Sequence, residues 1–302
     1  LMPSVLERKD LPAGNALNTS AQQILQSFAP MIVGFLIAIL SGYDIMTPAS
    51  QQGGPGQELA AYGYAFAINT GTFIFSAVLL SWVNVRPSET PHEGSMLRNI
   101  MLGFEAVWLD KPLRAFIIYI ALSQLFMMGN ILVGQPMMAS LRAPLFSYPA
   151  AMLLGMFGAS AGVGAVIGSL FAGFFARPSA ATYGPMLMII AIFRGLAMLS
   201  LGYFTDFYSV LSLFGCLGLF MGYTMVFFAT LMQTRVDIPM MGRMMSVMMF
   251  AIMGVVPFSA AFWGWGIEAW GLDMLYYISG AFMMIVAIGG FFSPSIRLMG
   301  YP

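Results

Sequence analysis

The sequence predicts an all-α polytopic membrane protein, and three of its properties carry this prediction. Of the 302 residues, 59% are hydrophobic and 8% are charged, and the mean hydropathy is +0.84, far above the values of soluble globular proteins. The apolar residues form runs of about 19 to 27 residues, the length that a helix needs to cross roughly 30 Å of hydrocarbon. The runs lack the alternation over about 10 residues that marks the strands of a membrane β-barrel.

The chain contains eight such runs, which polar or Pro- and Gly-bearing stretches separate. By hydropathy they cover about residues 21–42, 62–84, 113–138, 150–176, 183–205, 208–232, 244–266 and 274–292. Each run is long enough for one transmembrane helix, so we expect eight spans.

The basic residues indicate how the spans are oriented, because loops rich in Lys and Arg stay in the cytoplasm. The alternate boundaries between the runs hold most of them: Arg8, Lys9, Arg86, Arg98, Lys111, Arg114, Arg177, Arg235, Arg243 and Arg297. The other boundaries hold Arg142 with the acids Asp44, Glu58, Asp206, Glu268 and Asp273. The pattern predicts a multi-pass protein of the inner (cytoplasmic) cell membrane, surrounded by the lipid bilayer, with both ends in the cytoplasm.

One ionisable residue, Arg194, lies well inside an apolar run, where a charge is costly. It is about eleven residues from either end of its run, too deep for its side chain to reach a surface easily. We expect Arg194 to face a polar interior and to pair with an anionic substrate group or a carbonyl. If the run is drawn wrongly, Arg194 lies nearer a surface instead.

A second set of candidate substrate-binding residues lies on the run 113–138. These are Gln124, Asn130 and Gln135, whose amides suit a polar ligand. Hydrogen bonds between helices explain them equally well, so both interpretations stay open.

Small residues at helical spacing predict close packing of two runs. The pairs are Gly158/Gly162 and Gly164/Gly168 in the fourth run and Gly218/Gly222 in the sixth. The first pair flanks Ser160 in a G-x-S-x-G pattern, but a hydrolase would need a strand before it and a helix after it. The single histidine, His92, lies in a polar segment. We therefore expect no catalytic residues, no metal site, no cofactor and no enzyme, and the zero net charge argues against nucleic acid as a partner.

Residues 230–254, TLMQTRVDIPMMGRMMSVMMFAIMG, place three charged residues between two apolar runs. Pro239 suits the first turn of a helix, and Asp237 before it complements the helix dipole. A cytoplasmic turn that fixes the topology explains these charges. A role in moving the two helices is the alternative.

The N-terminal segments resemble transporters of the major facilitator superfamily. Residues 2–18, MPSVLERKDLPAGNALN, and 27–42, SFAPMIVGFLIAILSG, are similar to the region before and through the fifth helix of its exporters. Residues 29–34 align with the antiporter motif G-P-x-x-G-G. Pro30 and Gly34 match this motif, whereas alanine and valine replace two of its glycines.

Two further segments carry the same resemblance. Residues 96–116, MLRNIMLGFEAVWLDKPLRAF, resemble the cytosolic linker between the two halves of these transporters. Residues 233–247, QTRVDIPMMGRMMSV, resemble the turn between helices ten and eleven in the branch of the enterobactin exporter and macrolide efflux proteins. The matching positions of this turn are Gln233, Pro239, Gly242, Arg243 and Ser246.

The resemblance implies a partial major facilitator fold that contains helices five to twelve. Residues 1–85 would end the N-terminal bundle, residues 86–112 would form an amphipathic cytoplasmic linker, and residues 113–302 would form the C-terminal six-helix bundle. The chain would then be an N-terminally truncated fragment, and the coupling carboxylates of the family would lie in the missing helices. That expectation agrees with the lack of acids inside the apolar runs.

The function implied by the resemblance is transport. We expect secondary-active efflux of a small amphipathic molecule, a drug or a siderophore, by alternating access, with a proton as the candidate coupling ion. A complete eight-helix channel or facilitator and a non-functional fragment are the alternatives.

Overall fold

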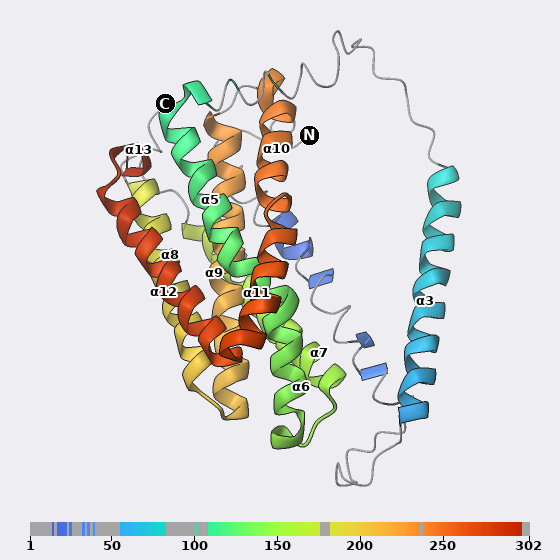
Figure 1. Ribbon diagram of the computed structural model, residues 1–302. Helices are drawn as coiled ribbons and strands as arrows, with labels where there is room; N and C mark the ends of the chain where they lie inside the picture. The colour runs from blue at the N-terminus through green and yellow to red at the C-terminus, as the bar shows by residue number, and fades with distance from the viewer. Residues whose placement is uncertain are drawn as a thin grey trace.

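The computed structural model describes residues 55–82, 108–175, 182–235 and 238–297, together with scattered positions before residue 108. Every regular element in these ranges is a helix, and six helical segments are long and apolar enough to cross a membrane (Figure 1). The all-α membrane fold is thereby confirmed. Of the two other expected spans, 62–84 falls on helix α3 (Pro55–Ser81), and 21–42 lies largely outside the described residues.

The first of the six spans, Lys111–Phe146, joins three helical segments without a loop. These are α5 (Lys111–Gly129), the π-helical turn η2 (Asn130–Gly134) and α6 (Gln135–Phe146). Asp110 begins the span, because its carboxylate accepts a hydrogen bond from the backbone N–H of Leu113 at 3.1 Å and satisfies a donor that a helix start leaves unpaired. The span ends at Ser147, whose φ is 59°.

The other spans follow in chain order. They are α7 (Ala150–Phe175), α8 (Tyr183–Tyr203), α9 (Phe207–Arg235), the pair α10 (Ile238–Met253) and α11 (Val256–Trp270), and α12 (Leu272–Phe292). A short helix, α13 (Pro294–Arg297), follows the last span. Pro257 explains why α10 and α11 are separate, because it lies in the first turn of α11, where its missing N–H is tolerated.

The six spans associate as three pairs. The most extensive contacts join the second span to the fourth (α7 with α9) and the third to the sixth (α8 with α12), and α5 of the first span packs on α11 of the fifth. This pairing is the one that two three-helix repeats related by a two-fold axis would give, an arrangement found in transporter bundles.

Helices α7 and α9 lie so close together that their backbones are in direct contact. A methyl group on Gly164 would overlap the carbonyl oxygen of Gly215, and a methyl group on Gly218 would overlap the carbonyl oxygen of Ala161. Gly168 and Gly222 meet the facing helix in the same way. Small residues permit this approach, which brings dispersion contacts that association in lipid requires.

Ser160 also lies at this contact rather than in a catalytic arrangement. Its hydroxyl donates a hydrogen bond to the carbonyl oxygen of Leu211 on α9 at 2.6 Å. The side chain therefore joins two helices, as polar residues inside membrane bundles often do.

The core of the bundle has two clusters of buried side chains. One contains Phe116, Leu187 and Phe227, and the other contains Met138, Phe157 and Trp263. Along α8, Ala191 belongs to the first cluster and Leu201 to the second. The segment of α8 between them carries Arg194.

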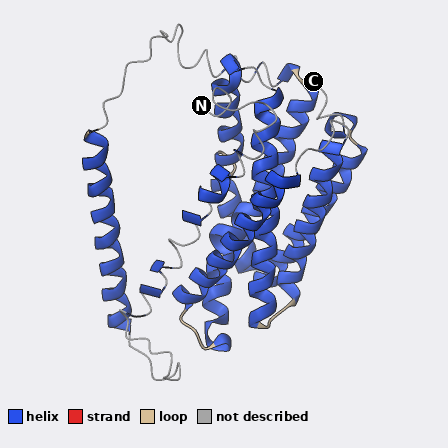
Figure 2. Ribbon diagram, turned by 180° about the vertical axis from the view of Figure 1, so that it is seen from behind, coloured by secondary structure: helices blue, strands red, loops and turns tan. Residues whose placement is uncertain are grey.

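Helix α3 stands apart from the bundle in both views (Figures 1 and 2). Its described side chains are exposed, Phe66, Phe73 and Phe75 among them. The predicted division at residues 85 and 112 stays a prediction, because nearly all of residues 83–107 lie outside the described part of the chain.

Candidate functional site

Arg194 lies near the middle of α8, about 16 Å along the helix axis from Tyr183 at 1.5 Å per residue. Its side chain is 7% exposed, and its Nε has no hydrogen-bond partner among the described residues. A buried charge normally finds partners, because an unpaired one is costly. The structure therefore places Arg194 inside the bundle, as the sequence predicted, and not near a surface.

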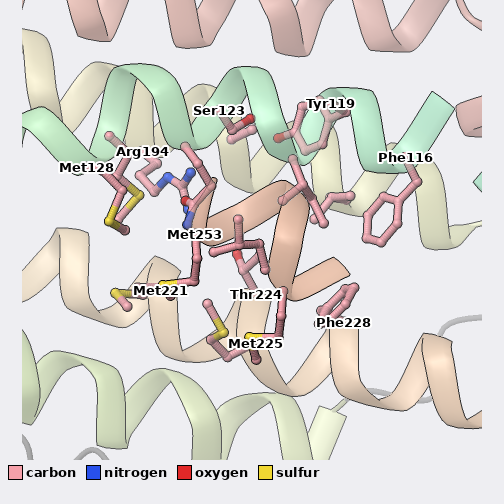
Figure 3. Close-up of a pocket in the computed structure, with 17 residues that line it drawn as sticks. Phe116, Tyr119, Ser123, Met128, Arg194, Met221, Thr224, Met225, Phe228 and Met253 are labelled. Carbon is pink, nitrogen blue, oxygen red and sulfur yellow. The ribbon is translucent and has the colours of Figure 1, made fainter. Parts of the chain in front are cut away.

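One cavity beside Arg194 is apolar, and we call it the apolar cavity. It has a volume of about 200 Å³ and lies between α5, α8, α9 and α10 (Figure 3). Aromatic and methionine side chains form most of its wall, including Phe116, Phe228, Met127, Met221, Met225 and Met249. Gln124, Ser123 and Thr224 add a few polar groups.

A second cavity also borders Arg194, and we call it the glycine-lined cavity. Its volume is about 190 Å³, and its wall includes Asn130 and Gln135 from the first span and Gly158, Gly162 and Gly218 from α7 and α9. Met127, Arg194 and Met221 line both cavities. The two spaces thus meet at the arginine.

The four candidate binding residues come together around these cavities. Arg194 lines both, Gln124 lines the apolar cavity, and Asn130 and Gln135 line the glycine-lined cavity. The side-chain amide of Asn130 donates to the carbonyl oxygen of Phe126 at 2.6 Å, but its Oδ1 has no partner among the described residues.

The π-helical turn explains how Asn130 and Gln135 reach the same cavity. Residues five apart in an α-helix point about 140° away from each other. In η2 the backbone N–H of Gln135 donates to the carbonyl oxygen of Asn130, and this wider i→i+5 turn brings the two side chains closer to one face of the helix. The sequence carries no clear signal for this turn.

Helix α11 supports the chain immediately before η2. The hydroxyl of Ser259 accepts a hydrogen bond from the backbone N–H of Gly129 at 2.7 Å and donates to the carbonyl oxygen of Leu125. A side chain at Gly129 would overlap the ring of Trp263. These contacts fix the position from which Asn130 projects.

The sequence did not single out the methionine lining or Tyr119, which lies on the wall of the apolar cavity. Methionine is frequent throughout this chain, with 28 residues, so its presence at one position carries no signal. Two of the predicted packing glycines, Gly158 and Gly162, line the glycine-lined cavity, and their packing role stays a prediction.

The structure adds little about the predicted motif residues. Pro30, Gly34 and Asp237 lie outside the described residues. The backbone is helical at Gln233, at the end of α9, and at Pro239, Gly242 and Arg243, in α10, whereas their side chains are outside the described part. Their conformational role stays a prediction.

Taken together, a bundle of paired membrane spans around cavities at mid-depth defines a multi-pass membrane transporter for a small molecule. Residues 1–260 match the sequence model of the Major Facilitator Superfamily, and the chain belongs to this family. No curated protein matches the chain.

Proposed function

We propose that this transporter is a secondary-active exporter of a small amphipathic molecule, a drug or a siderophore, and that Arg194 lies in its binding site. The observation that carries the proposal is the unpartnered Nε of Arg194 at the meeting point of two cavities. An ionisable residue at this depth marks a substrate or ion pathway by default.

The irregular parts of the spans support alternating access. The first span contains the turn η2, and the fifth is interrupted between Met253 and Val256. Both lie beside the cavities, since Asn130 lines one and Met253 lines the other. Interrupted helices at mid-membrane are characteristic of transport sites, because irregular backbone is tolerated in a membrane where it lines a cavity.

Several finer features belong to the same proposal. The alternation of basic residues favours an inner-membrane protein with both described ends of the bundle in the cytoplasm. The turn at residues 233–247 favours the branch of enterobactin and macrolide exporters. A proton is the proposed coupling ion, with Gln124, Asn130 and Gln135 as further ligand contacts.

Uptake into inside-out membrane vesicles tests the proposal, with the protein expressed from its native gene. Three fluorescent amphipathic probes are offered: the cation rhodamine 6G, the neutral dye Nile red and the anion dansylglycine. We expect accumulation of at least one probe when respiration energises the vesicles, and its loss when an ionophore collapses the proton gradient. Equilibration without a gradient would indicate a channel or facilitator and would contradict the proposal.

A matched pair of variants tests the role of Arg194. Arg194→Gln should slow the accumulation by a factor of about 10 to 100. Ser200→Ala, on the same helix, should transport like the wild type, because among the described residues the Ser200 hydroxyl donates only to the carbonyl of Leu196 in α8, at 2.9 Å.

A further inference from the structure

Two buried polar atoms of opposite kind lack partners beside the cavities. Nε of Arg194 is a donor without an acceptor, and Oδ1 of Asn130 is an acceptor without a donor, among the described residues. The two side chains are 7% and 5% exposed, and both line the glycine-lined cavity. Since buried polar groups are normally paired, this pair calls for a ligand that brings both an acceptor and a donor.

The charge of that ligand is inferred from where the acidic residues of the bundle lie. Arginine keeps its positive charge in proteins, so Arg194 needs an anion. Within the six spans the carboxylates are Glu268 and Asp273, both near span ends, and Asp273 lies 3.8 Å from Arg142. The described bundle thus offers Arg194 no carboxylate at its own depth, which leaves the guanidinium available to an anionic ligand.

The body of the ligand follows from the walls of the apolar cavity. Figure 3 shows Arg194 pointing into this cavity among methionine side chains. Phe116 and Phe228 present aromatic surface, and Met127, Met221 and Met225 present thioethers, which adapt to ligands of different shape. An aromatic or aliphatic body suits this wall.

The size of the cavities limits the ligand. Their volumes of about 200 and 190 Å³ place them together at the small end of ligand sites, which span roughly 300 to 1,000 Å³. A small organic anion from the aqueous phase fits such a space.

We propose that the substrate is a small amphipathic organic anion. Its carboxylate binds Arg194, a neighbouring hydroxyl or N–H group donates to Oδ1 of Asn130, and its apolar body fills the apolar cavity. This inference rests on the proposed function in treating the cavities as the transport site, and it names the chemical class of the substrate.

A fluorescence binding titration with three dansyl compounds distinguishes the contact to Arg194 from the contact to Asn130. The protein is expressed from its native gene and placed in nanodiscs of neutral phosphatidylcholine. Dansylglycine has the carboxylate and the N–H group, its methyl ester lacks the charge, and dansylsarcosine lacks the N–H group. We expect the wild-type protein to bind dansylglycine at least tenfold more tightly than the ester. Arg194→Gln should remove this preference.

The Asn130 contact has its own comparison. The wild-type protein should bind dansylglycine severalfold more tightly than dansylsarcosine, and Asn130→Leu should bind the two equally. Arg194→Lys, which keeps the charge, should retain preference for the acid over the ester if Arg194→Gln fails to fold. Ser200→Ala serves as the control that leaves all affinities unchanged.

Two results would overturn the inference: equal affinity of the wild-type protein for acid and ester, or undiminished dansylglycine binding by a folded Arg194→Gln variant. Displacement of dansylglycine by phosphatidylglycerol added to the nanodiscs would assign the site to a lipid anion and overturn the aqueous origin. The vesicle assay keeps the two proposals apart, because accumulation of rhodamine 6G without any acid preference refutes the anion alone. Anion binding without energised accumulation of any probe refutes the exporter alone.

Discussion

Two arginines are buried to almost the same extent in this bundle, yet their surroundings are opposite. Arg142, on α6, is 8% exposed, and Arg194, on α8, is 7% exposed. The guanidinium of Arg142 donates to the carbonyl oxygen of Phe204 at 2.7 Å and lies 3.8 Å from the carboxylate of Asp273. Nε of Arg194 has no partner among the described residues. Burial therefore does not distinguish the two arginines, whereas unsatisfied hydrogen-bonding capacity does.

The difference follows from position in the bundle. Arg142 lies where α6, α8 and α11 end, close to the loops, so it reaches a free carbonyl after α8 and an acid at the start of α12. Arg194 lies at mid-depth, where neighbouring backbones use their carbonyls inside helices. A charge at that depth has few protein partners, which is why we propose a ligand as the partner of Arg194.

The largest expected effect is on transport, at Arg194. A hydrogen bond to a charged group contributes about 1.5–3 kcal/mol, so Arg194→Gln should slow transport by a factor of about 10 to 100. Thermal stability should stay the same or rise, because an unpaired buried charge is removed. Vesicle uptake and the melting temperature measure the two quantities. Wild-type transport rates at equal expression would exclude Arg194 from the site.

Arg142→Gln should show the reverse pattern. The change removes the bond to the carbonyl oxygen of Phe204 and should cost about 2 kcal/mol of stability, seen as a melting temperature lower by several degrees. Transport per folded molecule should stay within about twofold of wild type. If Arg142→Gln lost transport without losing stability, Arg142 would behave like Arg194, and the proposed difference between the two arginines would be wrong.

Asp273→Asn should have a smaller effect than Arg142→Gln. The Asp273 side chain is 63% exposed, and the pair distance is 3.8 Å, so solvent screens the attraction and its loss should cost at most about 1 kcal/mol. Melting temperatures of the two single variants and the double variant measure the coupling. If Asp273→Asn lowered the melting temperature as much as Arg142→Gln, the ion pair with Asp273, and not the hydrogen bond to the Phe204 carbonyl, would be the main stabilising contact of Arg142.

The smallest expected effect is a pH dependence at Asp206, just before α9. Hydrogen bonds from the side chain and the backbone N–H of Ser209 lower the pKa of Asp206. The ionised form therefore stabilises the folded state above the ordinary aspartate pKa of about 3.9, and this contribution is lost as the pH falls through the lower folded value. Asp206→Asn removes the titration and keeps an oxygen acceptor for the helix start.

The melting temperatures of wild type and Asp206→Asn test this across pH. Their difference should shrink between pH 6 and pH 3. A constant difference over that range would mean that Asp206 does not contribute through its charge.

The spans were predictable because the bilayer imposes one simple requirement. Each must present about 20 apolar residues and satisfy its backbone internally, so hydropathy located the run 183–205 close to helix Tyr183–Tyr203. The run 113–138 was too short at its end, since the helix continues to Phe146. Arg142 and the residues around it resemble a loop in hydropathy, and their burial depends on Phe204, which is distant in sequence.

For the candidate site, the sequence alone identified which polar residues to consider, but not how they come together in the bundle. The cost of a charge in hydrocarbon singled out Arg194, and the scarcity of amides in apolar runs singled out Gln124, Asn130 and Gln135. These inferences need no knowledge of neighbours. Which polar atoms stay unpaired, that η2 aligns Asn130 with Gln135, and that two cavities meet at Arg194 depend on contacts between helices far apart in sequence. Packing of non-neighbouring segments leaves little trace in local composition, so the tertiary structure alone decides it.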